Sequence, residues 1–485
     1  MGKKRGYIRF IFSVLVLIVC HGCMVGPDYA KPETILPDSW HQAATEGLID
    51  GKAGIQTWWE YFNDPQLNSL IESAWKGNLD VKQAQARVYQ GRYQRAIAAG
   101  EKVPQIDAVG SFSRKRESEG IAPILPGGIS RTDNFYDIGA GLTWEIDVWG
   151  RVRRNIASAD YSYEASVEDF RDILVILCAD VAINYVQVRT LQARINYANE
   201  NVKRQEATLV LTSERFKAGL VPKLDVRQAD LNLARTKSVI PSLTEALEQT
   251  IHRLGVLIGK EPSVLFDRLS NAHPIPKPAT AITVGIPADI IRQRPDIRSA
   301  ERQLASQIEQ VGVATALLYP QFRLSGDFLF DSAQGSFAGI FSQRNTSWSF
   351  GPSFVWNLFD GDRIRSNIKF EEAVGDEAYL SYHQTVLEAL EDVENNMVAY
   401  AQENKRQDEL ENSVDAAQDS VDLVTVLYRT GLVDFQNVLD MERSLFQQQD
   451  ELVSSQGIVV VNLINIYRAL GGGWSLDRKE SLAKK

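Results

Sequence analysis

The stretch between Gly150 and Gly219 constrains this chain most, because its 68 residues contain neither glycine nor proline. Apolar residues recur in it at steps of three or four, which predicts a helix with a sustained, heptad-like apolar seam. At 1.5 Å per residue, a helix over 151–218 reaches about 100 Å. Globular domains rarely contain helices of this length. We therefore expect long helices that pack in a ring as a tube.

A second stretch of this kind, over 362–430, belongs to an internal duplication at an offset of 212 to 216 residues. Trp144 and Gly219 in the first copy match Trp356 and Gly431 in the second. Each copy has a helix, two short strands, a very long helix, a tight turn and a returning helix. The period is too long for a solenoid or a propeller, and indicates two quasi-equivalent halves of one architecture.

The duplication and its flanks divide the chain into five parts. These are a signal peptide (1–22), a lipid-anchored extended segment (23–63), a first repeat (64–285), a second repeat (286–474) and a C-terminal tail (475–485). The first repeat is expected to contain an opening helix from Asp64 to about 99, strands 104–113 and 136–148, the long helix 151–218 and a return helix 223–254. The second is expected to contain a helix over about 288–318, strands 321–330 and 347–358, the long helix 362–430 and a return helix 435–470.

The N-terminus has the features of an export signal. A basic start is followed by an apolar run from Ile8 to Cys20, which is short for a membrane-spanning helix. Gly22-Cys23 then resembles a bacterial lipobox, in which Cys23 is acylated and becomes the first residue. The alternative is ordinary signal cleavage beside an incidental cysteine. Only Cys178 would remain as a free thiol, so no disulfide framework is expected.

Charge and motifs argue against nucleic-acid binding and against catalysis. The formal net charge is −10, and removal of the four basic residues of the signal makes it −14. No basic stripe with interleaved aromatic residues is present. Gly255–Lys260 is one residue short of a phosphate-binding loop and is followed by Glu261 instead of Ser or Thr. The five histidines lack metal-ligand spacing. We therefore expect no enzyme activity, no metal and no cofactor other than the covalent lipid.

The predicted strands alternate apolar and polar residues, as in Tyr136, Ile138 and Ala140 against Asp137, Gly139 and Gly141. Runs of about ten residues with one apolar face and flanking aromatics are typical of a membrane β-barrel. The alternative is a soluble antiparallel sheet packed on one face. Four strands cannot close a barrel, and lipid does not tolerate open sheet edges. Three copies of the chain would supply twelve strands.

Several motifs together resemble the TolC-like outer-membrane factors, in particular the lipoprotein branch that serves resistance-nodulation-division pumps. They are Gly22–Tyr29, Thr57-Trp58-Trp59, Asp64–Leu67, Trp144–Arg151 and Arg292–Ile297. The resemblance implies an α+β membrane protein in the outer membrane of a Gram-negative bacterium. It further implies a homotrimer with a twelve-stranded β-barrel continuous with a twelve-helix coiled-coil periplasmic tunnel. Such channels are passive exit ducts for drugs and other small molecules, with a periplasmic adaptor and an inner-membrane transporter as partners.

The same resemblance assigns sites to the two tight turns. Adaptor docking falls on Arg215, Gly219 and Leu220 in the first repeat, and on Arg429, Gly431 and Leu432 in the second. The periplasmic gate falls on Tyr428 and Asp440. A ring of three aspartates near a three-fold axis would favour cations.

Each site residue has a simpler alternative. Tyr428 could serve helix packing, Asp440 could be a solvated carboxylate, and the two arginines could stabilise helix ends. Asn437 stands where some relatives carry a further gate aspartate. Two rival functions share parts of the pattern: a duct for secreted polypeptides, and a periplasmic structural lipoprotein that opens no pore.

Overall fold

The computed structural model describes residues 24–33, 36–37, 39–41, 48–50, 55–116, 132–277, 282–284, 293–333 and 340–474. The predicted signal peptide, Cys23 and the tail 475–485 lie outside the described residues. The chain divides into two compact units. One, here called the sheet unit, combines the residues up to Glu33 with Val88–Ser166 and Ala300–Tyr382. The other, the hairpin unit, combines Thr34–Arg87, Val167–Ser299 and His383–Lys485. Each unit takes segments from both repeats, so neither repeat is a compact unit by itself.

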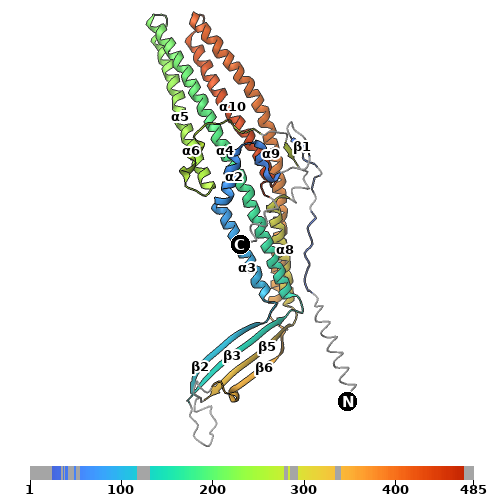
Figure 1. Cartoon of the computed structure of the whole chain (residues 1–485). Coiled ribbons are helices and arrows are strands. Elements are labelled where there is room, and N and C mark those ends of the chain that lie inside the picture. The colour runs from blue at the N-terminus through green and yellow to red at the C-terminus, as the bar shows by residue number, and fades with distance from the viewer. Residues whose placement is uncertain are drawn as a thin grey trace. The chain divides into compact units, whose positions relative to one another are not determined.

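Four strands form one antiparallel sheet in the order β2-β3-β5-β6 (Figure 1). The strands are β2 (Gln105–Arg116), β3 (Thr132–Ile146), β5 (Gln321–Ala333) and β6 (Thr346–Val355). Their ends lie within four residues of the predicted ones. The hairpin β2-β3 comes from the first repeat and β5-β6 from the second, and the two hairpins join through β3 and β5. The edges of the sheet are β2 and β6.

The register places the predicted apolar residues of all four strands on one face. A row across the sheet runs through Ile106, Leu142 and Gly326 to Phe350, and the next through Ala108, Ala140 and Phe328 to Trp348. The other face carries Asp107, Asp137, Asp327, Asp331 and a series of serines. Within the described residues the apolar face stays open, with Trp348 73%, Ile106 68% and Phe350 65% exposed. Within the described residues this face does not pack on a core of the same chain, as the alternative of a soluble sheet would require.

The duplication extends to hydrogen bonds at the base of the sheet. The indole nitrogen of Trp144 donates to the carbonyl of Lys102 at 3.0 Å. In the second repeat the indole of Trp356 donates to the carbonyl of Leu318, also at 3.0 Å. The two tryptophans are 212 residues apart and the two carbonyls 216, as the repeat requires. The same bond therefore closes each helix-to-strand corner.

The prediction of a single opening helix from Asp64 to about 99 is wrong in one respect, because the structure has two helices there. α2 (Pro65–Gly77) and α3 (Leu79–Gly100) meet at Asn78, whose ψ of 136° is not helical. The Asn78 side chain accepts from the backbone nitrogens of Asp80 and Val81, and so starts a new helix. Its amide also donates to the carbonyl of Leu257 at 2.9 Å. The break is fixed by a contact 179 residues away in sequence, which the local pattern does not reveal.

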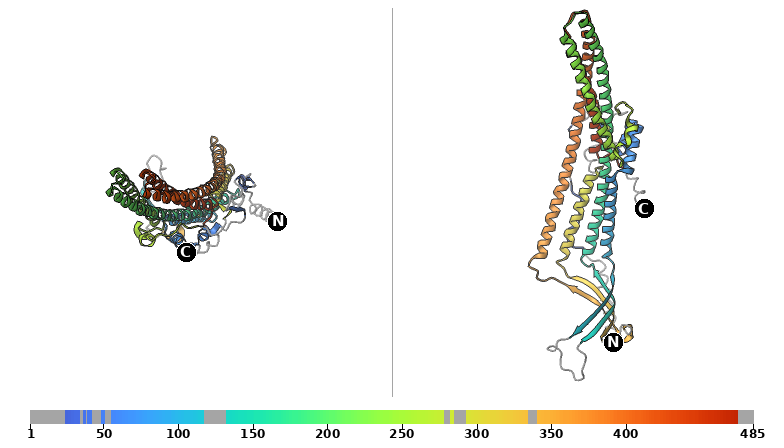
Figure 2. Two further views of the ribbon diagram at one scale, coloured as in Figure 1. Left: turned by 90° about the horizontal axis from the view of Figure 1, so that it is seen from above. Right: turned by 90° about the vertical axis from the view of Figure 1, so that its left-hand side faces the viewer.

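The long helices begin and end within three residues of the predicted bounds. They are α4 (Arg151–Lys217) and its return helix α5 (Lys223–Leu257), and α9 (Arg363–Thr430) and its return helix α10 (Phe435–Ala469). Figures 1 and 2 show the two pairs as antiparallel hairpins, green and orange to red. α8 (Pro295–Ala316) corresponds to α3 in the second repeat. The part of the prediction over 288–292 lies outside the described residues.

The predicted seam of α4 forms the core of the hairpin unit. Leu177, Val181 and Tyr185 are 4%, 0% and 1% exposed. By length and composition α4 could cross a membrane, but 56% of its most apolar stretch is buried within the chain, as in a core helix. The remaining described elements are short. They are β1 (Leu48–Asp50), paired in parallel with β4 (Ile282–Val284), the short 3-10 segments η1 (Ile55–Phe62), η2 (Pro262–Leu265) and η4 (Gln343–Asn345), and α6 (Phe266–Leu269).

Candidate functional site

The two hairpin tips have the same backbone structure. Gly219 and Gly431 adopt φ of 74° and 79°, a left-handed conformation that glycine adopts without strain. In each tip the residue after the glycine donates its N–H back to a carbonyl five residues earlier: Leu220 to Arg215 at 2.9 Å, and Leu432 to Leu427 at 2.9 Å. This is the Schellman arrangement, which satisfies the last carbonyls of a helix. The predicted stop signals thus end both long helices in the same way.

The tips expose apolar side chains at equivalent positions. Leu220 is 67% exposed and Leu432 is 73% exposed. Arg429 is exposed beside them. These three side chains are open to a partner, and they are among those predicted for adaptor docking. Their role in docking stays a prediction.

Arg215 is engaged within the chain. It extends from α4 to the end of α9, where its Nη1 donates to the carbonyls of Tyr428 and of Arg429, the latter at 3.0 Å. Its guanidinium carbon also lies 4.5 Å from the centre of the Tyr428 ring. A cation at a helix C-terminus is favourable, as is a cation over an aromatic face. The structure therefore supports the alternative considered for Arg215, which is stabilisation of a helix end, and that end belongs to the other hairpin.

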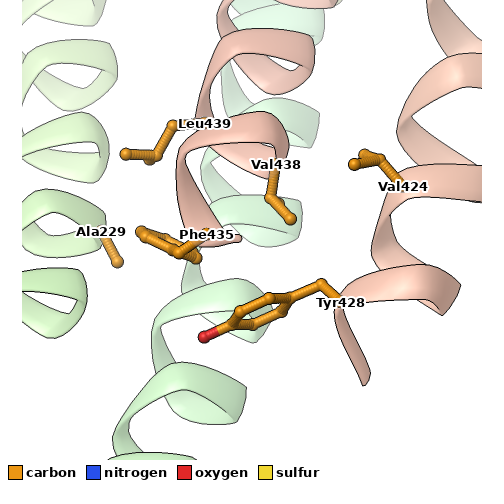
Figure 3. Close-up of a cluster of buried hydrophobic side chains, with 6 residues drawn as sticks. All are labelled: Ala229, Val424, Tyr428, Phe435, Val438 and Leu439. Atoms are coloured by element: carbon orange, nitrogen blue, oxygen red, sulfur yellow. The ribbon is translucent and has the colours of Figure 1, made fainter. Parts of the chain in front are cut away.

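Tyr428 packs in a cluster at the tip end of α10 (Figure 3). It is 2% exposed, and its ring centre lies 5.4 Å from that of Phe435. The other buried members of the cluster are Ala229, Val424, Val438 and Leu439. Burial raises the pKa of the phenol, although the neighbouring Thr212 and Arg215 oppose the shift. Within one chain Tyr428 thus joins α5, α9 and α10, which is the packing role considered for it.

Asp440 lies on α10 with its side chain 50% exposed. Its carboxylate accepts from Gln436 Nε2 at 2.9 Å, and Arg443 is 3.9 Å away. Both neighbours are on its own helix. Within one chain Tyr428 is thus buried, whereas the Asp440 side chain is half exposed. Their role as gate residues stays a prediction.

Farther from the tip than this cluster lies a row of buried polar residues that the sequence pattern did not predict. Glu442 of α10 is 6% exposed and accepts from Thr208 of α4 at 2.6 Å and from Asn232 of α5 at 3.2 Å. Further along, Asn201 donates to Gln449 at 2.7 Å. A signal was present in the sequence, because Glu442 stands three residues from Leu439 and three from Leu445, at a core position of the helical period.

The first described residues, here called the anchor segment (Met24–Lys31), dock on α4 and α8. Val25 N–H donates to the Trp149 carbonyl at 3.2 Å. The Tyr29 hydroxyl donates to Glu301 at 3.0 Å, and Lys31 lies 3.5 Å from the same carboxylate. Cys23 therefore precedes a segment held at the junction of β3 and α4. This docking was not predicted, since its partners are far apart in sequence.

A buried arginine fixes the anchor segment. Arg154 is 1% exposed and pairs with Asp28 at 2.7 Å and with Glu309 at 2.9 Å. Gly26 crosses α8 at Gly312 so closely that a Cβ on Gly26 would lie 2.6 Å from the Gly312 Cα. A Cβ on Gly312 would in turn lie 2.8 Å from Arg154 Cδ. Both glycines are thus required for the crossing.

In the part of the chain that the structure describes, no three His, Cys, Asp or Glu residues are grouped to hold a metal ion. Cys178 is buried there, with the Trp75 indole nitrogen 3.1 Å from its sulfur. It fills space in the core, as the apolar stretch around it predicts.

Solved structures share this architecture. The outer-membrane channel OprN is 33% identical, with a TM-score of 0.86 over 93% of this chain and 100% of that one. The outer membrane channel CmeC of Campylobacter jejuni has the same TM-score over 95% of this chain and 98% of that one; at 21% identity it shows the fold alone. A four-stranded antiparallel sheet with two long helical hairpins is thus the fold of a TolC-like outer-membrane channel.

The family follows from the sequence. The family model described as Outer membrane efflux protein matches residues 70–260 and 286–472, one stretch in each repeat, and this chain belongs to that family. Nodulation protein T of Rhizobium leguminosarum bv. trifolii is 32% identical over 480 residues, 98% of this chain and 99% of that protein. The toluene efflux pump outer membrane protein TtgI of Pseudomonas putida is 28% identical over 469 residues, 96% and 98% of the two chains.

The predicted family and function are confirmed at this level. The chain is an outer-membrane channel component of an efflux pump, and it resides in the outer membrane. Its family is that of outer membrane efflux proteins. A relative from Salmonella typhimurium, 25% identical over 468 residues, is named as a probable outer membrane lipoprotein, SilC.

Proposed function

We propose that three copies of this chain assemble into a passive exit duct, with a closed twelve-stranded barrel continuous with a twelve-helix tunnel. The carrying observation is the order of the sheet. With an even number of strands in alternating directions, the edge strands β2 and β6 run in opposite directions. When β6 of one copy meets β2 of the next, that junction is antiparallel like every other. A ring of copies then leaves no open edge in the lipid, and three copies give a strand number that bacterial barrels use.

The two faces of the sheet support the same assembly. The open apolar face would contact lipid, and the face with Asp107, Asp137, Asp327 and Asp331 would line a water-filled lumen. On that face Ser111 donates to Asp137 at 2.5 Å and Ser349 to Asp327 at 3.1 Å. Polar side chains that bind one another across strands stiffen the wall without closing it. A lumen of this kind contacts its cargo loosely, so selection falls to the pump.

The tips and the anchor have separate parts in this proposal. Exposed Leu220, Leu432 and Arg429 would dock a periplasmic adaptor, which connects the duct to an energy-supplying inner-membrane transporter of the resistance-nodulation-division class. Asp440, exposed on α10, would form a ring of three carboxylates at the periplasmic gate. Cys23 would carry the lipid, with the anchor segment holding it beside the strand ends. The exported class is small organic molecules, which the toluene relative favours over polypeptides.

A cysteine scan across the junction of two copies tests the assembly. Ser111→Cys on β2 is combined in turn with Ser347→Cys, Ser349→Cys and Ser353→Cys on β6, all on the polar face. Under oxidation in outer-membrane vesicles, one combination should yield covalent trimers far more efficiently than the others, because pairing across a junction has one register. The purified trimer should also conduct ions in planar bilayers.

Thr143→Cys on the inner strand β3 is the matched control, since it shares the polar face but lies away from both edges. With the same three β6 variants it should give monomers. If all combinations cross-link alike, or if none does, the closed ring is refuted. A trimer without conductance, even with Asp440→Ala, would refute the duct. Palmitate labelling that persists in Cys23→Ser would refute the lipid anchor alone.

A further inference from the structure

The Glu442 carboxyl is the most buried acidic group near the proposed gate. It lies between three helices: α10, which carries it, α4, which presents Thr208, and α5, which presents Asn232. Among the described residues it forms hydrogen bonds with these two neutral donors and no ion pair. A carboxylate held this way keeps its charge at a cost, because burial away from water disfavours the ionised form. Burial therefore favours the protonated form of Glu442 over the ionised form.

The charged groups around Glu442 are engaged elsewhere. On α10, Arg443 donates to Asn232 Oδ1 at 3.1 Å and lies 3.9 Å from the exposed Asp440. Glu206 of α4 and Lys237 of α5 pair with each other at 2.7 Å. Two further groups are directed toward Gln418 of α9: Arg204 donates to its side-chain oxygen, and Asp422 accepts from its amide at 3.0 Å. Otherwise α9 faces α10 at this level with the apolar side chains of Ala417 and Val421, packed on Leu445. Burial accordingly raises the pKa of Glu442, and the hydrogen bonds from Thr208 and Asn232 oppose the rise in part.

The first repeat lacks this arrangement. The residue 212 positions before Glu442 is Asp230 on α5, which is exposed and lies 3.4 Å from Arg227 on the same helix. The buried carboxyl is therefore specific to the return helix that also carries Asp440, two residues earlier. Asp440 is exposed on α10 while Glu442 contacts the other helices.

We propose that Glu442 positions the gate helix by binding a proton: protonated, it holds α10 against α4 and α5, and ionised, it loosens that contact and favours the open tip. This rests on the proposed duct, because it assigns a means of regulation to the same gate. The direction follows from burial. The contact between α10, α4 and α5 excludes water and therefore accommodates the protonated carboxyl better than the ionised one. Packing of α10 is accordingly firm at acidic pH and weakens as the pH rises through the pKa of Glu442.

Amide hydrogen exchange of residues 435–449 in the purified full-length protein tests this without requiring conductance. Wild type, Glu442→Gln and the control Asp230→Asn are compared at each pH from 5 to 8, so that intrinsic exchange rates cancel. Glu442→Gln keeps the shape and a hydrogen-bonding oxygen but cannot ionise. Wild type and Asp230→Asn should lose protection severalfold relative to Glu442→Gln as the pH rises over this range, because both keep the ionisable Glu442 and Glu442→Gln does not.

A second variant keeps the test decisive if Glu442→Gln folds poorly. Thr208→Val removes a donor to the ionised carboxyl without changing side-chain shape, so it should raise the pKa of Glu442 further. The pH at which protection is lost then moves upward. The inference is overturned if Glu442→Gln follows the wild-type pH profile, or if Thr208→Val leaves the midpoint in place or lowers it. In bilayers, a conducting trimer whose pH-dependent open probability survives Glu442→Gln would refute this inference and leave the duct intact, whereas a trimer that never conducts would refute the duct.

Discussion

The guanidinium of Arg215 caps a helix that is not its own. It lies 4.5 Å from the ring of Tyr428 and donates to the last carbonyls of α9, although it extends from α4. The residue 212 positions later is Leu427, so the second repeat has no equivalent arginine. The contact is therefore made once per chain, and it ties the end of one hairpin to the end of the other.

Replacing Arg215 with Met should loosen the tips while keeping the unbranched side chain. Loss of the cap and of the cation–ring contact is expected to cost about 1–2 kcal/mol locally. Exchange of amides over 424–434 should accelerate roughly five- to thirty-fold. Arg429→Met is the control, because Arg429 is exposed and contributes only its carbonyl to the contact. Equal protection in Arg215→Met and wild type would show that the contact is incidental.

Glycine-to-alanine substitutions in α9 and in α8 should have opposite effects on the stability of the protein. At Gly375 of α9 nothing lies within 4 Å of an added Cβ, so Gly375→Ala should stabilise by about 0.5–1 kcal/mol. At Gly312 of α8 the Cβ would meet the buried Arg154 side chain at 2.8 Å, and Gly312→Ala should destabilise by about 1–3 kcal/mol. Thermal unfolding measures the stability of both variants, and the rate of proteolysis in the anchor segment reports on its docking. Stabilisation by Gly312→Ala would mean that the crossing is looser than described.

Asp172 of α4 should make stability depend on pH. Burial, and then the nearby Asp296, raise its pKa to about 6, against the attraction of Arg294. Because the pKa of Asp172 is higher in the folded than in the unfolded state, its contribution to the free energy of unfolding is fully present below about pH 4. That contribution is lost as the pH rises through about 6. The free energy of unfolding of Asp172→Asn should therefore rise relative to that of wild type across that window, by on the order of 1–3 kcal/mol at pH 8. Asp408→Asn, an exposed carboxylate on α9, controls for the lost charge. A constant difference from pH 4 to 8 would contradict the assignment.

The proposed gate predicts a change in ion selectivity. Asp440→Asn removes the charge from each copy, and the preference for cations over anions in planar bilayers should fall several-fold. Tyr428→Phe removes only a buried hydroxyl and should leave selectivity unchanged, since the ring packs within one chain. Reversal potentials in a salt gradient distinguish the two. Unchanged selectivity in Asp440→Asn would remove Asp440 from the pore.

Most of the architecture could be predicted because its signals are local. Helix ends at Gly219 and Gly431 follow from glycines that take a left-handed turn, and the faces of the strands follow from a period of two. The break at Asn78 could not be predicted, because its amide is held by Leu257 across 179 residues. The docking of the anchor segment depends on Arg154, Asp28 and Glu309, which are adjacent only after folding.

The site was predictable in position but not in contacts. Glycine and basic residues marked the tips, yet which arginine was exposed and which engaged depended on the neighbouring hairpin. Tyr428 matched a family position, and its burial became visible only when Phe435 and Ala229 surrounded it. Glu442 stands at a core position of the helical period, but its partners Thr208 and Asn232 are more than 200 residues away in sequence. Tertiary partners, not residue types, decide these assignments.

The pairing of β3 with β5 has a consequence for the order in which the protein can be made. These strands begin at Thr132 and Gln321, and all of α4 and α5 lies between them. A two-stranded hairpin is marginally stable alone, so β2 and β3 remain unconsolidated while the next part of the chain is exported. The apolar face is then completed only when the second half of the chain has crossed the inner membrane. Because the sheet is completed late, its full apolar face does not form while the chain is still close to the inner membrane.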